Sequence, residues 1–386
     1  MVKARFSTWH AWGRALVLGL GVALGAPPIT QAAEPAAASA VPPEPRWLRV
    51  PKLYGRITAR ELGLVINTAD PYSVAVGEHY ARRRGILPEH ILRVQLPVRA
   101  SLTTEEFRAL DEVIRSQMPE QVHGLALAWT LPYAVDCNSL TSALAIGLQP
   151  QVCANSCAAT KVSPYTQYFG ARPWLVLGIR PAMQIAARSV PAALALIERG
   201  IAADHTLATP ASTPARAYFA ATPDAARNVR ERLFPPAGSV PGVAALEVTR
   251  VHSDSLPPMQ RILVYETGLA KVPAPLGGEW LPGALADHLT SFGGQLDKPV
   301  GDGQMNILDW IEAGATASYG TVSEPCNHLQ KFPHPQMLML AYAQGVSALE
   351  AYWHSVAWPA QGVFVGEPLA APFAAPPATA ASATTP

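Results

Sequence analysis

The pattern of hydrophobic and polar positions predicts a strand followed by a helix near the start of the chain. LGLVINTA (62–69) is a nearly continuous apolar run, as in a strand buried on both faces. Val76 and Tyr80 then recur at helical spacing, after Ser73 as the capping residue and before Gly85 as the stop. This segment therefore predicts one strand-helix unit of an α/β fold.

The same alternation continues to residue 130. Two further apolar runs have the length of strands, ILRVQLP (91–97) and GLALAWT (124–130). Between them, Thr103 and Glu106 have the spacing of a capping box and open a helix with one apolar face. Alternating strands and helices predict a parallel sheet that helices cover on both faces.

Later in the chain the pattern repeats. Apolar runs predict strands at 174–179, 216–222, 245–251, 261–267, 315–321 and 363–366. Periodicity and capping residues predict helices at 189–201, at 223–234, at 307–314, from residue 336 and from the capping box at 347–350. The whole pattern predicts two consecutive α/β subdomains, residues 56–205 and 206–373, with mainly parallel sheets flanked by helices.

The N-terminus has the layout of a secretory signal peptide. Basic residues at positions 3, 5 and 14 precede an apolar run, ALVLGLGVALGA (15–26), and small residues follow in TQAA (30–33). The run has about half of the ~20 residues that a membrane-spanning helix needs. We therefore expect residues 1–33 to be removed, and the mature protein to be periplasmic or extracellular without a stable membrane anchor.

Composition and charge add two expectations for the mature chain. The segments 34–55 and 374–386 are rich in alanine and proline, and we expect both to be disordered. The net charge is only +1, and the single basic triplet (82–84) lies at a predicted helix C-terminus, where it complements the helix dipole. This distribution argues against a nucleic-acid partner.

The four cysteines, Cys137, Cys153, Cys157 and Cys326, are expected to form at least one disulfide in an oxidising compartment. Their spacing does not fix the connectivity. A zinc site that joins Cys153, Cys157 and Cys326 to His328 is a weaker alternative, because the Cys-x3-Cys pair has no second close pair beside it. We predict no metal site and no cofactor.

The stretch DHLTSFGGQ (287–295) combines an acid, an imidazole, two hydroxyls and a Gly-Gly pair. As a catalytic site it would use Ser291 as nucleophile with His288 nearby, although no G-x-S-x-G elbow surrounds the serine. As a turn, its hydroxyls would satisfy local backbone donors and its glycines would let the chain reverse. The sequence favours a structured turn on the rim of a binding cleft.

Other groups bring further candidate chemistry to the same rim. Cys326 follows a predicted strand, where α/β folds place functional loops, and His288 or His328 could activate its thiol. A disulfide at Cys326 is the favoured alternative in an exported protein. Glu324 and Asp287 could act as paired carboxylates on a glycan if their separation suits that chemistry. Four tryptophans could stack on sugars, although such residues more often belong to a core: Trp280, Trp310, Trp353 and Trp358.

Four segments carry a resemblance to a known family. They read LVINTADPYSVAVGEHYARRRGI, LPGALADHLTSFGG, ATASYGTVSEPCNH and ALEAYWHSVAWPAQGVFVGEPLAAPF. With them, the chain between residues 63 and 373 resembles a conserved family of exported bacterial proteins whose activity is unassigned. The resemblance implies export and brings no substrate with it.

A more distant similarity lies in the order of WLVLGIRP, NILDWIEAGATASYGT and GVFVGEP along the chain. This order is similar to that in gingipain-type peptidases of the caspase-like fold. The resemblance implies two α/β subdomains and a cysteine-histidine dyad on loops at the carboxyl ends of adjacent strands. In that family a His-Gly follows the strand that aligns with ILVYET, and the thiol follows the next strand. This chain has GLA (268–270) and LTS (289–291) at these places, so the usual dyad is missing.

Two classes of function follow from these observations. The favoured class is a non-catalytic or divergent protein of gingipain-like architecture that binds a peptide or a glycan at its loop rim. The alternative is a cysteine or serine peptidase or amidase with a relocated nucleophile. The binding candidates are Ser291, Glu324 and His328, and the catalytic candidates are Cys326, His288 and Asp287.

Overall fold

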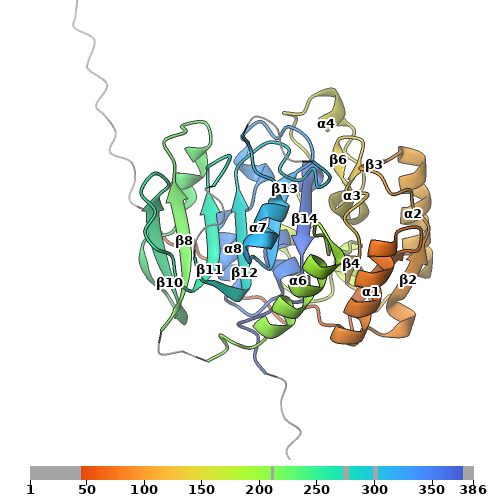
Figure 1. Ribbon diagram of the computed structural model, residues 1–386, viewed down its shortest axis with the longest axis horizontal. Helices are drawn as coiled ribbons and strands as arrows, with labels where there is room; N and C mark the ends of the chain where they lie inside the picture. Colours follow the sequence, from red (N-terminus) through yellow and green to blue (C-terminus); the bar gives the residue numbers. More distant parts are fainter. Residues whose placement is uncertain (1–44, 210–212, 273–277, 299–302, 377–386) are drawn as a thin grey trace, which may run out of the picture. The chain divides into compact units, whose positions relative to one another are not determined.

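A computed structural model describes residues 45–209, 213–272, 278–298 and 303–376 (Figure 1). The predicted signal peptide (1–33) lies outside the described residues, as do the first half of the leader predicted at 34–55 and all but the first three residues of the tail predicted at 374–386. The described chain therefore covers both predicted subdomains apart from three short internal gaps.

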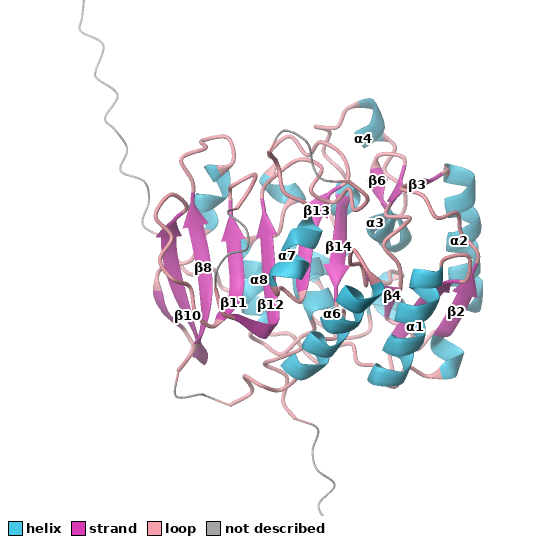
Figure 2. Ribbon diagram, in the orientation of Figure 1, coloured by secondary structure: helices cyan, strands magenta, loops and turns pink. Residues whose placement is uncertain are grey.

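One large sheet runs through the described chain (Figure 2). Its strands stand in the order β2 (Ile91–Val94), β1 (Leu62–Asn67), β4 (Gly124–Leu127), β7 (Ala182–Gln184), β14 (Gly362–Gly366), β13 (Ala317–Thr321), β12 (Trp280–His288), β11 (Ile262–Thr267), β8 (Ala215–Ala221), β10 (Val243–His252) and β9 (Gly238–Val240). A second, small sheet holds β3 (Ser101–Leu102), β5 (Ala134–Val135) and β6 (Asn138–Ser139).

Most neighbouring strands of the large sheet are parallel. β1 pairs in parallel with β2 and β4, and β11 does so with β8 and β12. The two antiparallel pairs are β13 with β14 and β9 with β10. The predicted α/β class and mainly parallel pairing are therefore confirmed. The two predicted subdomains, however, contribute strands to one continuous sheet, because β14 lies between β7 and β13.

Helices cover both faces of this sheet. In Figure 1, α1, α6 and α7 lie in front of the sheet and α8 lies behind it. β1 shows the same division, because Leu64 and Ile66 belong to the core that contains α1, whereas Val65 belongs to a second core with α2 and α3. The helices are α1 (Pro71–Arg84), α2 (Thr104–Gln117), α3 (Leu140–Ile146), α4 (Gln151–Ala154), α5 (Pro173–Leu177), α6 (Val190–Ala203), α7 (Ile307–Ala313), α8 (Pro335–Tyr342) and α9 (Ala348–Ser355). Short 3-10 helices are η1 (Pro88–His90), η2 (Pro164–Gln167), η3 (Asn228–Leu233), η4 (Leu329–Lys331) and η5 (Pro359–Gln361).

The predicted capping signals are confirmed at most helix ends. The capping boxes of α2 and α9 are both formed, and Ser189 caps α6. At α1 the predicted cap is wrong: Asp70 caps the helix by accepting the Tyr72 N–H at 3.0 Å. Ser73 instead accepts the Asn67 N–H at 2.8 Å and so ties the first turn of the helix to β1.

Two predicted elements differ from the structure. The predicted strand at 174–179 is the helix α5, and the strand at this place in the fold is β7. Pro173 occupies the first turn of α5 and Gly178 ends it with a φ of 67°. The helix predicted at 223–234 is reduced to the 3-10 helix η3, which ends before Pro235.

Candidate functional site

Loops that follow β4, β12 and β13 converge on one another and include the predicted rim. One disulfide, Cys157–Cys326, joins the segment after β4 to the loop after β13, and a second, Cys137–Cys153, lies within the segment after β4. Ser323 Oγ donates to the Cys137 carbonyl oxygen at 2.8 Å, which ties the loop after β13 to the loop after β4. The predicted disulfide bonding is thus confirmed and its connectivity is defined. Disulfides indicate an oxidising compartment.

Cys326 does not present a thiol. Its sulfur is bonded to Cys157, which contradicts the predicted catalytic nucleophile and the alternative zinc site. Cys326 has a φ of 59°, and its N–H donates to Glu324 Oε1 at 2.7 Å. The loop is therefore held by a covalent bond and by local hydrogen bonds, and it carries no reactive sulfur.

Glu324 and His328 lie half-buried on the same loop. Besides its side-chain bond to the Cys326 N–H, Glu324 accepts through its backbone carbonyl from Gln361 Nε2 at 2.7 Å. The His328 ring lies 5.9 Å from the ring of Trp358, measured between centroids. No hydrogen bond joins Glu324 to Asp287 in the described chain, so the proposed carboxylate pair is not brought together by such a contact.

His288 is locked on the inner side of the rim. The indole N–H of Trp310 donates to His288 Nδ1 at 2.9 Å, so the proton of the neutral imidazole is on Nε2, which donates to the Met305 carbonyl at 2.9 Å. Burial lowers the pKa of His288 to about 4, which keeps the ring neutral. Both nitrogens are therefore engaged, and no hydrogen bond joins the ring to half-buried Ser291.

Asp287 belongs to a buried cluster of charged residues. Arg230 Nη2, on η3, donates to Asp287 Oδ1 at 2.5 Å and to Glu266 Oε2 at 2.6 Å. Glu266 and Asp287 are direct neighbours across β11 and β12, and all three side chains are buried. Burial raises the pKa of Glu266 well above its usual value and raises the pKa of Asp287 as well. The Arg230 guanidinium acts against this shift, because its positive charge favours the ionised form of both carboxyl groups.

The rest of the 287–295 stretch is a packed turn. The Gly294 N–H donates to the Thr321 carbonyl at 2.9 Å, and the Ile307 N–H donates to the Gly293 carbonyl at 2.9 Å. A Cβ on Gly294 would lie 2.7 Å from the carbonyl oxygen of Gly320, so only glycine fits this close approach. Residues 289–295 thus form a structured turn, whereas Asp287 and His288 are the last two residues of β12.

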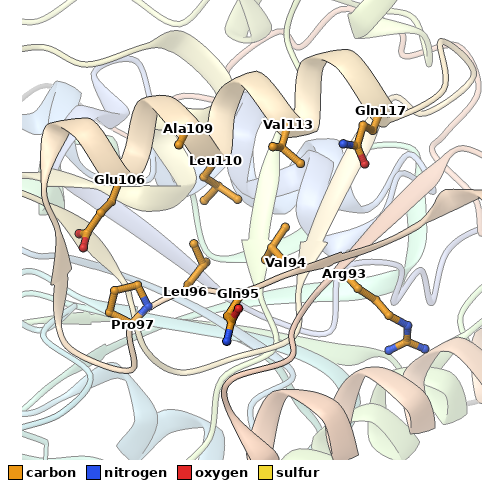
Figure 3. Close-up of a pocket in the computed structure, with 10 residues that line it drawn as sticks. All are labelled: Arg93, Val94, Gln95, Leu96, Pro97, Glu106, Ala109, Leu110, Val113 and Gln117. Carbon is orange, nitrogen blue, oxygen red and sulfur yellow. The ribbon is translucent and has the colours of Figure 1, made fainter.

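A groove opens at the β2 edge of the large sheet, between this strand and the helix α2 (Figure 3). It has a volume of about 420 Å³. Val94 and Leu96 come from β2 and the segment after it, while Ala109, Leu110 and Val113 come from α2. Polar side chains at the groove are Arg93, Gln95, Glu106 and Gln117, and none of its lining residues is aromatic.

The backbone of β2 has one free side beside this groove. The Val94 carbonyl accepts the Thr68 N–H at 2.8 Å, and the Leu96 N–H donates to Asn67 Oδ1 at 2.9 Å. Because backbone groups alternate in direction along a strand, those of Arg93 and Gln95 point away from β1. No strand of the described chain lies beyond β2, so this edge is open for pairing.

The charges at the groove are largely paired within the protein. Arg93 binds Glu78 of α1 at 2.5 Å, and Arg99 binds Glu106. The groove therefore has an apolar floor and little net charge along its edges. Sequence reasoning missed it, although an amphipathic helix with a capping box directly after a strand was a usable signal.

Comparisons with known proteins leave the family undefined. No protein-family model matches the chain, and no curated protein matches it. In the described residues no group of three or more His, Cys, Asp or Glu residues could hold a metal ion, and no helix is long and apolar enough to cross a membrane. The geometry of the described chain is therefore the basis for its proposed function.

Proposed function

We propose that the protein is exported and binds an extended peptide segment, which pairs with β2 and fills the groove between β2 and α2. The observation that carries this proposal is the open edge of β2 directly beside an apolar groove. Peptides bind open sheet edges as added strands, because their main chain forms hydrogen bonds and their alternate side chains enter pockets.

The groove suits one face of such a strand. Every second side chain of an extended peptide would point toward Val94, Leu96 and Leu110, while its backbone would meet the free groups of Arg93 and Gln95. Burial of apolar side chains contributes about 25 cal/mol per Å² of area removed from water. We therefore expect a ligand with alternating apolar residues and no requirement for high charge.

A peptide fits this groove better than a glycan does. Sugars stack on exposed aromatic rings, and the groove lining has no aromatic residue. Of the four tryptophans considered for stacking, Trp310 and Trp353 are fully buried in the core. Trp280 packs edge-on against Trp310, with 6.1 Å between their centroids, and belongs to the same cluster.

The catalytic candidates at the loop rim have no free reactive group. The Cys326 sulfur is in a disulfide, both nitrogens of His288 are engaged, and Asp287 is held by Arg230. A nucleophile needs a base within hydrogen-bond reach, and these three residues supply neither a free thiol nor a free imidazole. We therefore propose no hydrolysis at these residues.

The test is a selection of random dodecapeptides displayed on phage against the purified protein, followed by affinity measurements on the selected synthetic peptides. Ala109→Arg places a long side chain at an exposed position of α2 that lines the groove. Ser116→Arg adds the same charge at an exposed position of α2 outside the groove lining and is the matched control. Arginine favours helices, so neither variant should disturb folding.

The expected result is a set of selected peptides with alternating apolar residues. Ala109→Arg should weaken their binding at least about tenfold, equivalent to about 1.4 kcal/mol, and Ser116→Arg should leave it unchanged. The proposal fails if no peptide is selected, or if the selected peptides bind Ala109→Arg as well as they bind the unmodified protein.

A further inference from the structure

Four exposed hydrophobic side chains lie on α5 or on two preceding segments that a backbone hydrogen bond joins. Tyr54, Phe169, Leu175 and Val176 are four of the nine large hydrophobic residues that are exposed in the described chain. The Tyr54 N–H donates to the Phe169 carbonyl at 2.7 Å, so these two segments lie side by side. α5 begins four residues after Phe169. We call these four residues the α5 patch.

The two sides of α5 have different environments. Trp174 faces the protein, where the Arg180 guanidinium lies 3.6 Å from its ring centroid, and Leu177, three residues on, packs against the core. Leu175 and Val176 lie on the opposite side of this helical turn, and they are 56% and 65% exposed. The helix is therefore anchored by one side, and it presents two aliphatic residues to its surroundings.

Cations stand beside the patch without acidic partners. Lys52 Nζ lies 5.6 Å from the Tyr54 ring centroid, and Arg172 directly precedes α5. Both side chains are exposed, and in the described residues neither forms an ion pair. Of the neighbouring acidic residues, Glu61 accepts hydrogen bonds from Thr58, and Glu120 lies near Arg180. Lys52 and Arg172 are therefore two exposed cations beside the patch that no carboxylate binds in the described residues.

We propose that the α5 patch docks the protein reversibly on an anionic lipid surface. Leu175 and Val176 enter the boundary between headgroups and acyl chains, while Tyr54 and Phe169 lie at the level of the headgroups. Lys52 and Arg172 bind lipid phosphates. The charges of the two sides are complementary, because the unpaired cations beside the aliphatic side chains would meet the negative headgroups of an anionic lipid surface. Such docking is peripheral and is independent of the peptide groove.

The test measures how the purified full-length mature protein co-sediments with vesicles. One set contains phosphatidylglycerol and phosphatidylcholine in equal parts, and the other contains phosphatidylcholine alone. Val176→Asp places a carboxylate in the patch. Val98→Asp makes the same change at another exposed valine outside the patch, 50% exposed, and is the matched control. Arg172→Glu reverses one of the unpaired charges.

We expect binding to the anionic vesicles and little binding to the neutral ones. Val176→Asp should lower the partition coefficient at least about tenfold, since it replaces a buried contact with a charge at the interface. Arg172→Glu should weaken only the anionic binding, and Val98→Asp should have no effect. The proposal is overturned if the unmodified protein does not bind anionic vesicles or if Val176→Asp binds them equally. It is also overturned if the patch instead forms a dimer that Val176→Asp dissociates in solution.

Discussion

Asp287 and His288 are adjacent in the sequence, yet their side chains lie on opposite faces of the large sheet. β12 extends through both residues, so their side chains point to opposite faces of the sheet. Asp287 faces Arg230 on η3, and His288 faces Trp310 on α7. The sequence suggested a joint catalytic role because proximity along a chain resembles proximity in space only where the backbone turns. Here the strand continues and separates the two groups.

The buried cluster of Arg230, Glu266 and Asp287 gives a prediction at this scale. Arg230→Met leaves two buried carboxyl groups without their cation, and we expect it to lower the free energy of unfolding by about 3–5 kcal/mol. Arg227→Met removes the half-exposed pair with Asp224 and should cost at most about 1 kcal/mol. Urea-induced unfolding of both variants provides the measurement.

The loss in the free energy of unfolding caused by Arg230→Met should depend on pH in a defined direction. The pKa values of both carboxyl groups are raised in the folded protein, and removing the guanidinium raises them further. A raised carboxyl pKa makes folding less favourable as the pH rises above the usual values of 4.5 and 3.8, because the unfolded chain ionises first. The deficit relative to the unmodified protein should therefore grow with pH, and a deficit that shrinks would contradict the raised pKa values of the two carboxyl groups.

At the scale of elements, capping signals were the most reliable part of the sequence. Capping boxes depend on residues three positions apart, so Thr103 with Glu106 and Ser347 with Glu350 could be recognised without knowing the fold. The strand predicted at 174–179 failed because a short apolar run does not distinguish a strand from a helical turn with an exposed apolar side. The groove could not be predicted, because its two walls come from segments whose distance only the fold defines.

The capping boxes of α2 and α9 have opposite responses to pH, which gives a prediction for α9. Burial raises the pKa of Glu350 to about 7, whereas hydrogen bonds from Thr103 and Arg99 lower the pKa of half-exposed Glu106. The contribution of Glu350 to stability is thus complete below its usual pKa of 4.5 and is lost as the pH rises toward about 7. Glu350→Gln should flatten the pH dependence of the urea midpoint in this window.

Glu106→Gln is the control with the opposite sign. Because the pKa of Glu106 is lowered, its contribution is present above the usual value of 4.5 and is lost as the pH falls below that value. This variant should leave the profile between pH 4.5 and about 7 unchanged and alter only the acid limb. If Glu350→Gln also leaves the profile unchanged, Glu350 does not titrate as its burial requires.

At the scale of the whole molecule, the strand order was beyond the reach of sequence patterns. The alternation of strands and helices predicted a mainly parallel sheet, and this class is confirmed. The final strand β14, however, pairs with β13 and β7 in the middle of the sheet, where it joins the two halves of the chain. Periodicity records which face a strand buries and not which neighbour it meets, so two separate sheets were as compatible with the pattern as one.

The two disulfides close chain loops of very different length. Cys157–Cys326 joins residues 169 positions apart, whereas Cys137–Cys153 joins residues 16 positions apart. In the chain-entropy view a disulfide stabilises by restricting the unfolded chain, and the effect grows with the logarithm of the loop length. The long link should therefore contribute about 2 kcal/mol more to the free energy of unfolding than the short one does.

The comparison needs two double variants that each remove one disulfide cleanly. Cys157→Ser with Cys326→Ser opens the long loop, and Cys137→Ser with Cys153→Ser opens the short one. Serine preserves the size of the side chain, so each variant removes only the loop constraint. Urea-induced unfolding should give the first variant a lower free energy of unfolding than the second, because it loses the longer loop. Equal losses would mean that the long link acts mainly through local packing of the rim. In that case the join between the two halves of the chain depends on β14 rather than on the covalent bond.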